Sequence, residues 1–173
     1  MILVLVIGKG SHESYLDLAL VSRAFGASAI TFCAKDAGDI RSIERAINGT
    51  NSKWGGKFSV SHTKNWKEFI KEKKNYLKIY LTMYGLPMKK LEYQIRTYKN
   101  ILLIVSFTEA IKPLYRAADF NISITAQPHT CASAISVFLH NFYNGRELAL
   151  HFENAGYKVV PEEHSIHIQK SKG

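Results

Sequence analysis

The side chains best suited to nucleophilic or metal chemistry are seven histidines and two cysteines, Cys33 and Cys131. His129 stands two residues before Cys131, and an imidazole beside a thiol can activate it as a nucleophile. The other interpretation, which we favour, is a buried thiol near a hydrogen-bonded imidazole. These residues do not show the paired spacing of a structural zinc site, and two cysteines do not make a disulfide framework. The sequence therefore predicts no metal and reduced cysteines.

Glycine-rich segments can hold phosphates, and Gly8-Lys9-Gly10 follows the apolar run at the start of the chain. A dinucleotide fingerprint needs a third glycine three residues later. Glu13 stands there, and its carboxylate opposes a pyrophosphate. The chain also lacks the lysine motif of a nucleotide-binding P-loop. These observations argue against a nicotinamide or flavin cofactor.

A second loop with binding chemistry is Gln127-Pro128-His129-Thr130. It follows a strand pattern and precedes a helix pattern, so the first amides of that helix point into the loop. Thr130 is a suitable N-cap residue, and Pro128 restricts the backbone before it. Such a loop can hold a polar ligand group through backbone amides.

The charge of the chain suggests a polyanionic partner. Lys and Arg number 23 against 14 Asp and Glu, a formal net charge of +9. Such an excess favours phosphates through counterion release, although it can also serve solubility alone. Trp66 and Tyr76 lie among the densest lysines, and they either stack on unpaired bases or point inward beneath a solvated helix face. The residues that we expect to contact RNA are Lys64, Lys67, Lys71, Lys73, Lys74, Lys89 and Lys90.

Length and composition indicate one soluble globular domain. The chain has 173 residues, of which 46% are hydrophobic and 21% charged. Its apolar runs are far shorter than the ~18 residues of a membrane span. Residues 1–7 also lack the basic start and cleavage site of a signal peptide. We therefore expect an intracellular protein with no membrane partner.

The chain alternates strand and helix patterns. Strands are predicted at residues 2–7, 29–33, 58–61, 77–81, 101–105 and 120–124, with two short ones at 157–160 and 165–169. Helices are predicted at residues 15–25, 39–47, 66–73, 88–97, 111–118 and 131–143. We expect Asn48-Gly49 to end the second helix and Tyr84-Gly85-Leu86-Pro87 to stop the fourth strand.

This alternation is typical of βαβ units, which build an α/β fold with a mostly parallel sheet and helices on both faces. Ligands of such sheets bind beyond the carboxyl ends of the strands. The loops expected to form a site are therefore residues 8–13, 82–87, 106–110 and 125–130.

Four stretches together resemble the archaeal tRNA ribose 2′-O-methyltransferases that act on the T-loop cytidine at tRNA position 56, a family of the SPOUT superfamily. They are Arg23-Ala24-Phe25-Gly26-Ala27, Trp54-Gly55-Gly56-Lys57-Phe58 with Asn65-Trp66, Leu81-Thr82-Met83-Tyr84-Gly85-Leu86, and Ala118-Asp119-Phe120-Asn121 running into Gln127-Pro128-His129. The resemblance extends from Ile2 to about Val160.

The resemblance implies a single SPOUT-type domain over residues 1–173, with a trefoil knot at about 77–143 and a short tail at 144–173. It also implies a cytoplasmic homodimer that binds S-adenosyl-L-methionine and methylates tRNA. The cofactor-binding positions carried over from the family are Leu81, Ser106, Phe107, Thr108, Glu109, Ala110, Ile124, Thr125, Ala126, Gln127, Pro128, His129, Thr130 and Cys131.

The chain departs from the family pattern where catalysis would occur. Glu13 aligns with an arginine of the family, and a carboxylate repels the phosphate that an arginine would hold. Ser106, Thr125 and Cys131 replace two glycines and a glutamate, which predicts a narrowed cofactor pocket. Losing one electrostatic stabiliser predicts transfer slower by at least ~100-fold. No catalytic residue is assigned.

Three functions therefore remain open. The chain is an active methyltransferase, a non-catalytic paralogue that binds RNA or a partner subunit on the same dimeric scaffold, or an enzyme with a changed substrate. An arginine from elsewhere, such as Arg23 or one of the other subunit, would restore the first function if it reached the site.

Overall fold

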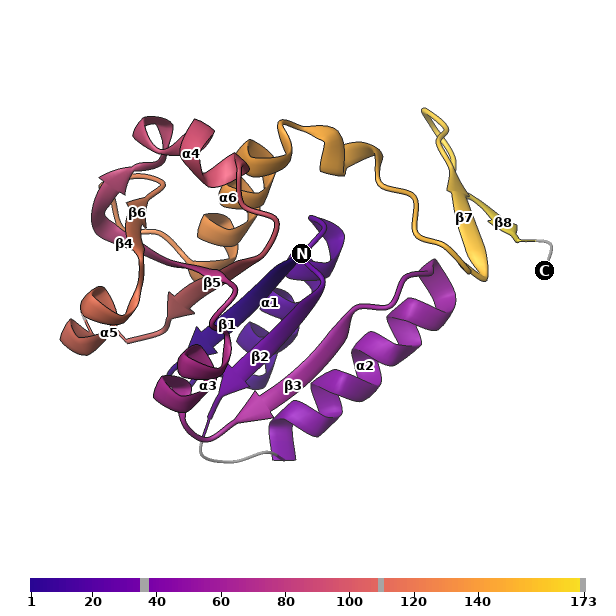
Figure 1. Ribbon diagram of the computed structural model, residues 1–173. Helices are drawn as coiled ribbons and strands as arrows, with labels where there is room; N and C mark the ends of the chain where they lie inside the picture. Colours follow the sequence, from indigo (N-terminus) through magenta and orange to yellow (C-terminus); the bar gives the residue numbers. More distant parts are fainter. Residues whose placement is uncertain (35–37, 109–110, 172–173) are drawn as a thin grey trace.

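The computed structural model describes residues 1–34, 38–108 and 111–171 (Figure 1). Six strands pair in parallel in the order β3-β2-β1-β5-β4-β6. This arrangement confirms the predicted parallel sheet. The strands are β1 (Ile2–Ile7), β2 (Ala29–Cys33), β3 (Ser59–Thr63), β4 (Leu77–Pro87), β5 (Ile101–Ser106) and β6 (Phe120–Ser123).

Helices cover both faces of the sheet, as predicted (Figure 1). Side chains of β1 and β5 alternate between two buried clusters because successive residues of a strand point to opposite faces. One face is covered by α1 (His12–Ala24), α2 (Gly38–Trp54), α4 (Glu92–Arg96) and α6 (Cys131–Tyr143). The other face is covered by α3 (Trp66–Glu72) and α5 (Lys112–Ala117). The predicted helix at 88–97 is divided into a 3-10 turn, Met88–Lys90, and α4.

Helix α2 does not end at Asn48-Gly49, so that prediction was wrong. The helix continues through Gly49, whose φ is not positive, to Trp54. It ends at Gly55 and Gly56, whose φ angles of 80° and 87° lie in the left-handed region that glycine adopts freely.

Strand β4 likewise continues past its predicted stop and reaches Pro87. Its pairing with β6 shifts between Leu81 and Leu86, so that Leu81 and Leu86 both face Ile122. Gly85 makes this shift sterically feasible, since a Cβ there would lie 2.5 Å from the amide nitrogen of Ile122. The residues expected to form a turn therefore form an irregular strand pressed against β6.

The C-terminal segment packs against the ends of α1 and α2. Strands β7 (Tyr157–Val160) and β8 (His167–Lys170) form an antiparallel hairpin beyond the end of α2 (Figure 1). Before the hairpin, Phe152 lies 4.5 Å from the guanidinium carbon of Arg23, and the Glu153 carbonyl accepts from the Gly56 amide at 2.8 Å. Across the described ranges, no helix is long and apolar enough to cross a bilayer.

Candidate functional site

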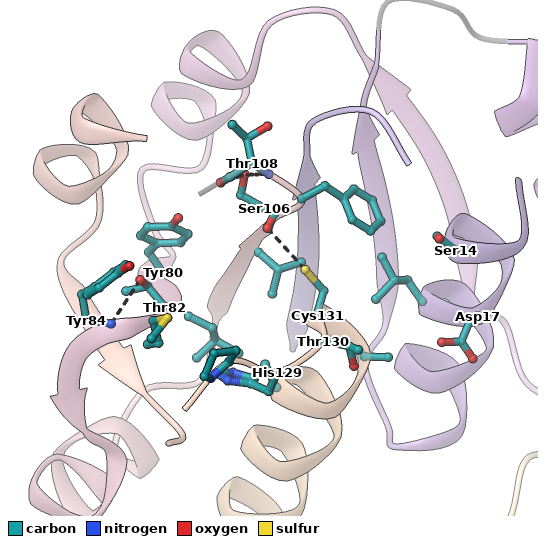
Figure 2. Close-up of a pocket in the computed structure, with 18 residues that line it drawn as sticks. Ser14, Asp17, Tyr80, Thr82, Tyr84, Ser106, Thr108, His129, Thr130 and Cys131 are labelled. Carbon is teal, nitrogen blue, oxygen red and sulfur yellow. Dashed lines mark hydrogen bonds between the residues drawn. The ribbon is translucent and has the colours of Figure 1, made fainter. Parts of the chain in front are cut away.

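A cavity of about 450 Å³ opens at the carboxyl ends of β4 and β5, between α1 and the start of α6 (Figure 2). This volume falls within the range of about 300–1,000 Å³ that is typical of small-molecule sites. The position is the one expected for a ligand of a parallel α/β sheet. The described lining residues are Ser14, Asp17, Leu18, Tyr80, Leu81, Thr82, Met83, Tyr84, Val105, Ser106, Phe107, Thr108, Pro128, His129, Thr130, Cys131, Ala132 and Ala134.

The start of α6 forms one wall of this pocket. The Thr130 hydroxyl accepts a hydrogen bond from the Ser133 amide at 3.1 Å, so Thr130 is the predicted N-cap. His129 Nδ1 lies 2.7 Å from the Gln127 carbonyl oxygen. Because a carbonyl only accepts hydrogen bonds, Nδ1 carries the hydrogen and neutral His129 keeps its lone pair on Nε2. The wall therefore offers backbone amides and one imidazole proton acceptor.

Cys131 links this wall to the end of β5. Its thiol donates to the Ser106 carbonyl at 3.4 Å, and burial raises the pKa of Cys131. The thiol is consequently protonated at neutral pH, whereas the thiolate is the nucleophile. His129 is engaged with Gln127 rather than with Cys131, so the geometry supports the buried-thiol interpretation over a nucleophilic pair.

Aromatic residues form the opposite wall. Tyr80 is buried, and its desolvation, with smaller contributions from Tyr115 and Cys131, raises the pKa of Tyr80 to about 12. The Tyr115 ring packs edge-on against the Tyr80 ring. The Tyr115 hydroxyl lies 2.9 Å from the Thr82 hydroxyl. Tyr84 is 62% exposed at the rim. The exposed Tyr84 ring offers a surface against which a flat apolar group can pack.

Phe107 does not close the pocket. Its ring packs against Tyr15, with centroids 5.8 Å apart, and a Cβ at Gly10 would lie 2.7 Å from the ring. Tyr15 in turn accepts from the Gly10 amide at 3.0 Å and donates to the Gly8 carbonyl at 3.2 Å. The bulky side chain that replaces a family residue is thus held against residues 8–15.

The structure brings together eight of the predicted cofactor residues and separates the others. Those that line the pocket are Leu81, Ser106, Phe107, Thr108, Pro128, His129, Thr130 and Cys131. Four others precede Pro128 in the chain but do not line the pocket: Ile124, Thr125, Ala126 and Gln127. Glu109 and Ala110 lie outside the described residues.

The sequence argument missed the α1 wall, formed by Ser14, Asp17 and Leu18 (Figure 2). No signal in the sequence marks these residues, because their proximity depends on α1 packing beside α6. Tyr80 was also missed, whereas Thr82, Met83 and Tyr84 lay in the expected loop 82–87 but, like Tyr80, were not among the predicted cofactor residues. Three of these four belong to the Leu81–Leu86 stretch that carried the resemblance, which was the available signal.

Glu13, the residue that aligns with the family's arginine, does not reach this pocket from the start of α1. Backbone hydrogen bonding at the helix start and the Ser11 hydroxyl lower the pKa of Glu13, so residue 13 carries a negative charge. His12 Nε2 lies 2.9 Å from the Ser42 hydroxyl, a partner on α2 that the sequence did not reveal. Neither residue lines the pocket.

Arg23 cannot take over the role of the missing arginine. Its guanidinium is buried, donates to Asn51 Oδ1 at 2.9 Å and to the Gly55 carbonyl at 2.5 Å, and lies over the Phe152 ring. These contacts join α1, α2 and the C-terminal segment. Arg23 is therefore a structural residue.

The lysines expected to contact RNA lie in two separate regions. Lys67 and Lys71 are exposed on α3, whose Trp66 and Ile70 pack on the face shared with α5. Lys89 and Lys90 are exposed in the turn whose Met88 packs on the opposite face. The ammonium of Lys73 lies 4.9 Å from the Phe69 ring. Trp66 and Tyr76 are partly buried against the core, which favours the solvated-face interpretation for these two aromatics.

Comparison with known proteins gives consistent matches. The family described as tRNA ribose 2′-O-methyltransferase, aTrm56, matches residues 54–169. A tRNA (cytidine(56)-2′-O)-methyltransferase of Methanocaldococcus jannaschii is 35% identical, covering 90% of this chain and 88% of that one.

Two solved structures are similar in fold. The TrmH/SpoU tRNA modifying enzyme of A. aeolicus has a TM-score of 0.60 at 12% identity, covering 86% of this chain and 76% of that chain. The SpoU methyltransferase AviRb of Streptomyces viridochromogenes, in complex with AdoMet, has a TM-score of 0.57 at 18% identity, covering 83% and 60%.

Proposed function

The chain belongs to the tRNA ribose 2′-O-methyltransferase family aTrm56, and we propose that it methylates the 2′-hydroxyl of the T-loop cytidine at tRNA position 56 with S-adenosylmethionine as methyl donor. The observation that carries this proposal is the pocket at the ends of β4 and β5, where two of the stretches that carry the family resemblance, Leu81–Leu86 and Gln127–His129, meet. The relatives matched over 90% of the chain favour this function over a non-catalytic one.

The residues of the pocket fit S-adenosylmethionine. Its volume of about 450 Å³ suits a nucleoside-sized ligand. The exposed Tyr84 ring offers a surface for the adenine ring, and backbone groups at the start of α6 and the end of β5 offer hydrogen bonds to polar groups. The hydrogen bond from the Cys131 thiol to the Ser106 carbonyl holds the start of α6 to the end of β5, so this part of the pocket is shaped before the cofactor arrives.

When bound, S-adenosylmethionine supplies a methyl group that is activated for transfer to the ribose oxygen. The chain must orient that oxygen and receive its proton. His129 is the side chain in the pocket with a free nitrogen lone pair at Nε2, because its Nδ1–H is held by the Gln127 carbonyl. We assign proton acceptance to His129 on this ground.

The substrate is expected to meet the lysines around α3. Phosphate contacts by exposed lysines position an RNA without reading its sequence. Lys64, Lys67, Lys71 and Lys74 are exposed, and no ion pair involves them among residues whose contacts are described. They are therefore available to phosphates.

Further features of the proposal concern assembly. We propose a single domain with a trefoil knot at about residues 77–143, supported by membership of the family and by the likeness in fold to the TrmH/SpoU enzyme. We also propose a cytoplasmic homodimer with α6 at or near its interface, supported by the exposed apolar side chains of Val137, Leu148 and Leu150. Light scattering at micromolar concentration tests the dimer, and a monomer would contradict it.

Calorimetry with S-adenosylmethionine is the first test of the function, followed by transfer of a labelled methyl group to a tRNA transcript. A second transcript with a 2′-deoxycytidine at position 56 is the matched control. Binding together with transfer to the first transcript alone is expected. Binding without transfer to either transcript would instead support the non-catalytic paralogue, and absence of binding would contradict every enzymatic function.

A further inference from the structure

Asp17 is a charged residue without a role in the contacts described so far. It lies on α1 and lines the pocket on the side of Thr130, across from the wall formed by Tyr80, Thr82 and Tyr84 (Figure 2). Within the described part of the chain, its carboxylate forms no ion pair or side-chain hydrogen bond. Neither helix packing nor capping therefore explains a carboxylate at this position.

The other residues that line the pocket show why the charge of Asp17 matters. Among the described lining residues Asp17 is the only acidic one, and none is a lysine or an arginine. A cationic group of a ligand thus has one charged partner in the pocket. S-adenosylmethionine has two such groups, the sulfonium and the α-ammonium of its methionine part.

The chemistry of the two cations distinguishes them. An ammonium has three N–H donors and forms short, charge-assisted hydrogen bonds with a carboxylate, whereas a sulfonium has no N–H. Asp17 is solvent-exposed, and at an exposed site bare Coulomb attraction is weak while a hydrogen bond adds direction. We infer that Asp17 binds the α-ammonium of the cofactor and so selects ligands that carry the amino-acid part.

This inference rests on the proposed function, because it names one contact within the same pocket. Three ligands test it by calorimetry: S-adenosylmethionine, S-adenosylhomocysteine, which lacks the sulfonium charge, and methylthioadenosine, which lacks the whole amino-acid part. Asp17→Asn keeps the shape of the side chain and removes the charge. Glu44→Gln, an exposed residue on α2 outside the pocket, is the matched control for loss of one negative charge.

Asp17→Asn is expected to lower the affinities for S-adenosylmethionine and S-adenosylhomocysteine alike, by about five- to tenfold. This is the loss expected for a partly exposed charge-assisted hydrogen bond. Methylthioadenosine affinity should not change, and Glu44→Gln should alter none of the three. Loss confined to S-adenosylmethionine would overturn the assignment in favour of the sulfonium. Equal weakening of all three ligands, or unchanged affinities, would also overturn it.

The outcome separates this inference from the function beneath it. If the wild-type protein binds S-adenosylmethionine and Asp17→Asn binds it equally well, only the role of Asp17 is lost. If the wild-type protein binds none of the ligands, the cofactor and the role of Asp17 are both rejected. Circular dichroism of the variant verifies the fold in either case.

Discussion

Two parts of the sheet's carboxyl edge differ in how they hold their residues. The cofactor side, made of residues 80–84, 105–108 and 128–134, is partly buried and largely neutral. Its groups are held by contacts within the site, such as the Cys131 thiol on the Ser106 carbonyl. The acceptor side, residues 8–14, presents the exposed and polar Ser11, His12 and Glu13, with His12 attached to α2 instead.

Under the proposed function, this difference teaches that the residues that bind the methyl donor can be changed separately from the exposed segment at the start of α1. The cofactor side depends on close backbone approach, so it tolerates few changes of shape. The acceptor side depends on exposed charge, which a substitution can reverse without unfolding the protein. Variants on the two sides should therefore fail in different ways.

The largest effect is expected at Gly85, directly after residues 80–84 of the cofactor side. Gly85→Ala places a Cβ 2.5 Å from Ile122 N, so we expect a loss of about 1–3 kcal/mol in the free energy of unfolding, with weaker cofactor binding. Gly49→Ala is the control, because its Cβ meets open space and helix propensity then favours alanine. Urea denaturation measures both, and equal stability of the two variants would contradict this account of β4.

Histidine variants compare the two sides directly. His129→Gln should lower methyl transfer by about 100-fold, the lower bound for loss of a general base, with cofactor affinity kept. His12→Gln should change transfer far less, because its ring is attached to Ser42 and does not line the pocket. Single-turnover assays give both rates. Similar losses in the two variants would remove the assigned role of His129.

The lysine variants ask which face of the sheet meets the RNA. Changing Lys71, Lys73 and Lys74 to Glu should weaken tRNA binding by at least about tenfold and flatten its salt dependence. Unrelated RNAs should be affected about equally, since phosphate contacts carry no sequence information. Lys89→Glu with Lys90→Glu is the counterpart on the opposite face. If only this second pair weakens binding, the RNA surface lies there.

The buried thiol gives a pH-dependent readout of the cofactor side. Burial raises the pKa of Cys131, so its thiolate fraction at pH 7.5 is below that of a free cysteine. In a Cys33→Ser background, iodoacetamide should therefore react with Cys131 more slowly than with a model thiol of pKa about 8.5. The rate should rise with pH as the thiolate forms. A rate equal to that of the model thiol would show an open site.

The smallest effect is expected at Glu13. Glu13→Arg restores the charge of the family residue, but residue 13 does not line the pocket, so the new side chain is misplaced. Transfer should stay within about fivefold of wild type, because charges at fully exposed sites interact weakly. A gain of two orders of magnitude would show that charge alone had limited the acceptor side.

Much of the fold followed from local pattern, and the exceptions have physical causes. Alternating strands and helices predicted the parallel sheet, and the strand-end rule identified the loops of the pocket. The α1 wall with Asp17 was invisible because it depends on which helices share a face. For the same reason, the sequence did not reveal that the lysines of α3 lie on one face of the sheet and Lys89 and Lys90 on the other. The predicted ends at Gly49 and Gly85 were wrong because a glycine ends a helix or strand only where the backbone adopts a conformation that other residues avoid.

The position of β1 in the sheet bears on synthesis of the chain. β1 lies between β2 and β5, with Ile2 opposite Ile101 and Ile7 opposite Ser106. The ribosome adds about 5–20 residues per second, so β1 waits roughly 5–20 s for that partner strand to be made. During this time one edge of an apolar strand is unpaired, which is the form that associates with other chains. The nascent chain is therefore most exposed to aggregation, and most in need of a chaperone, before residue 106 leaves the ribosome.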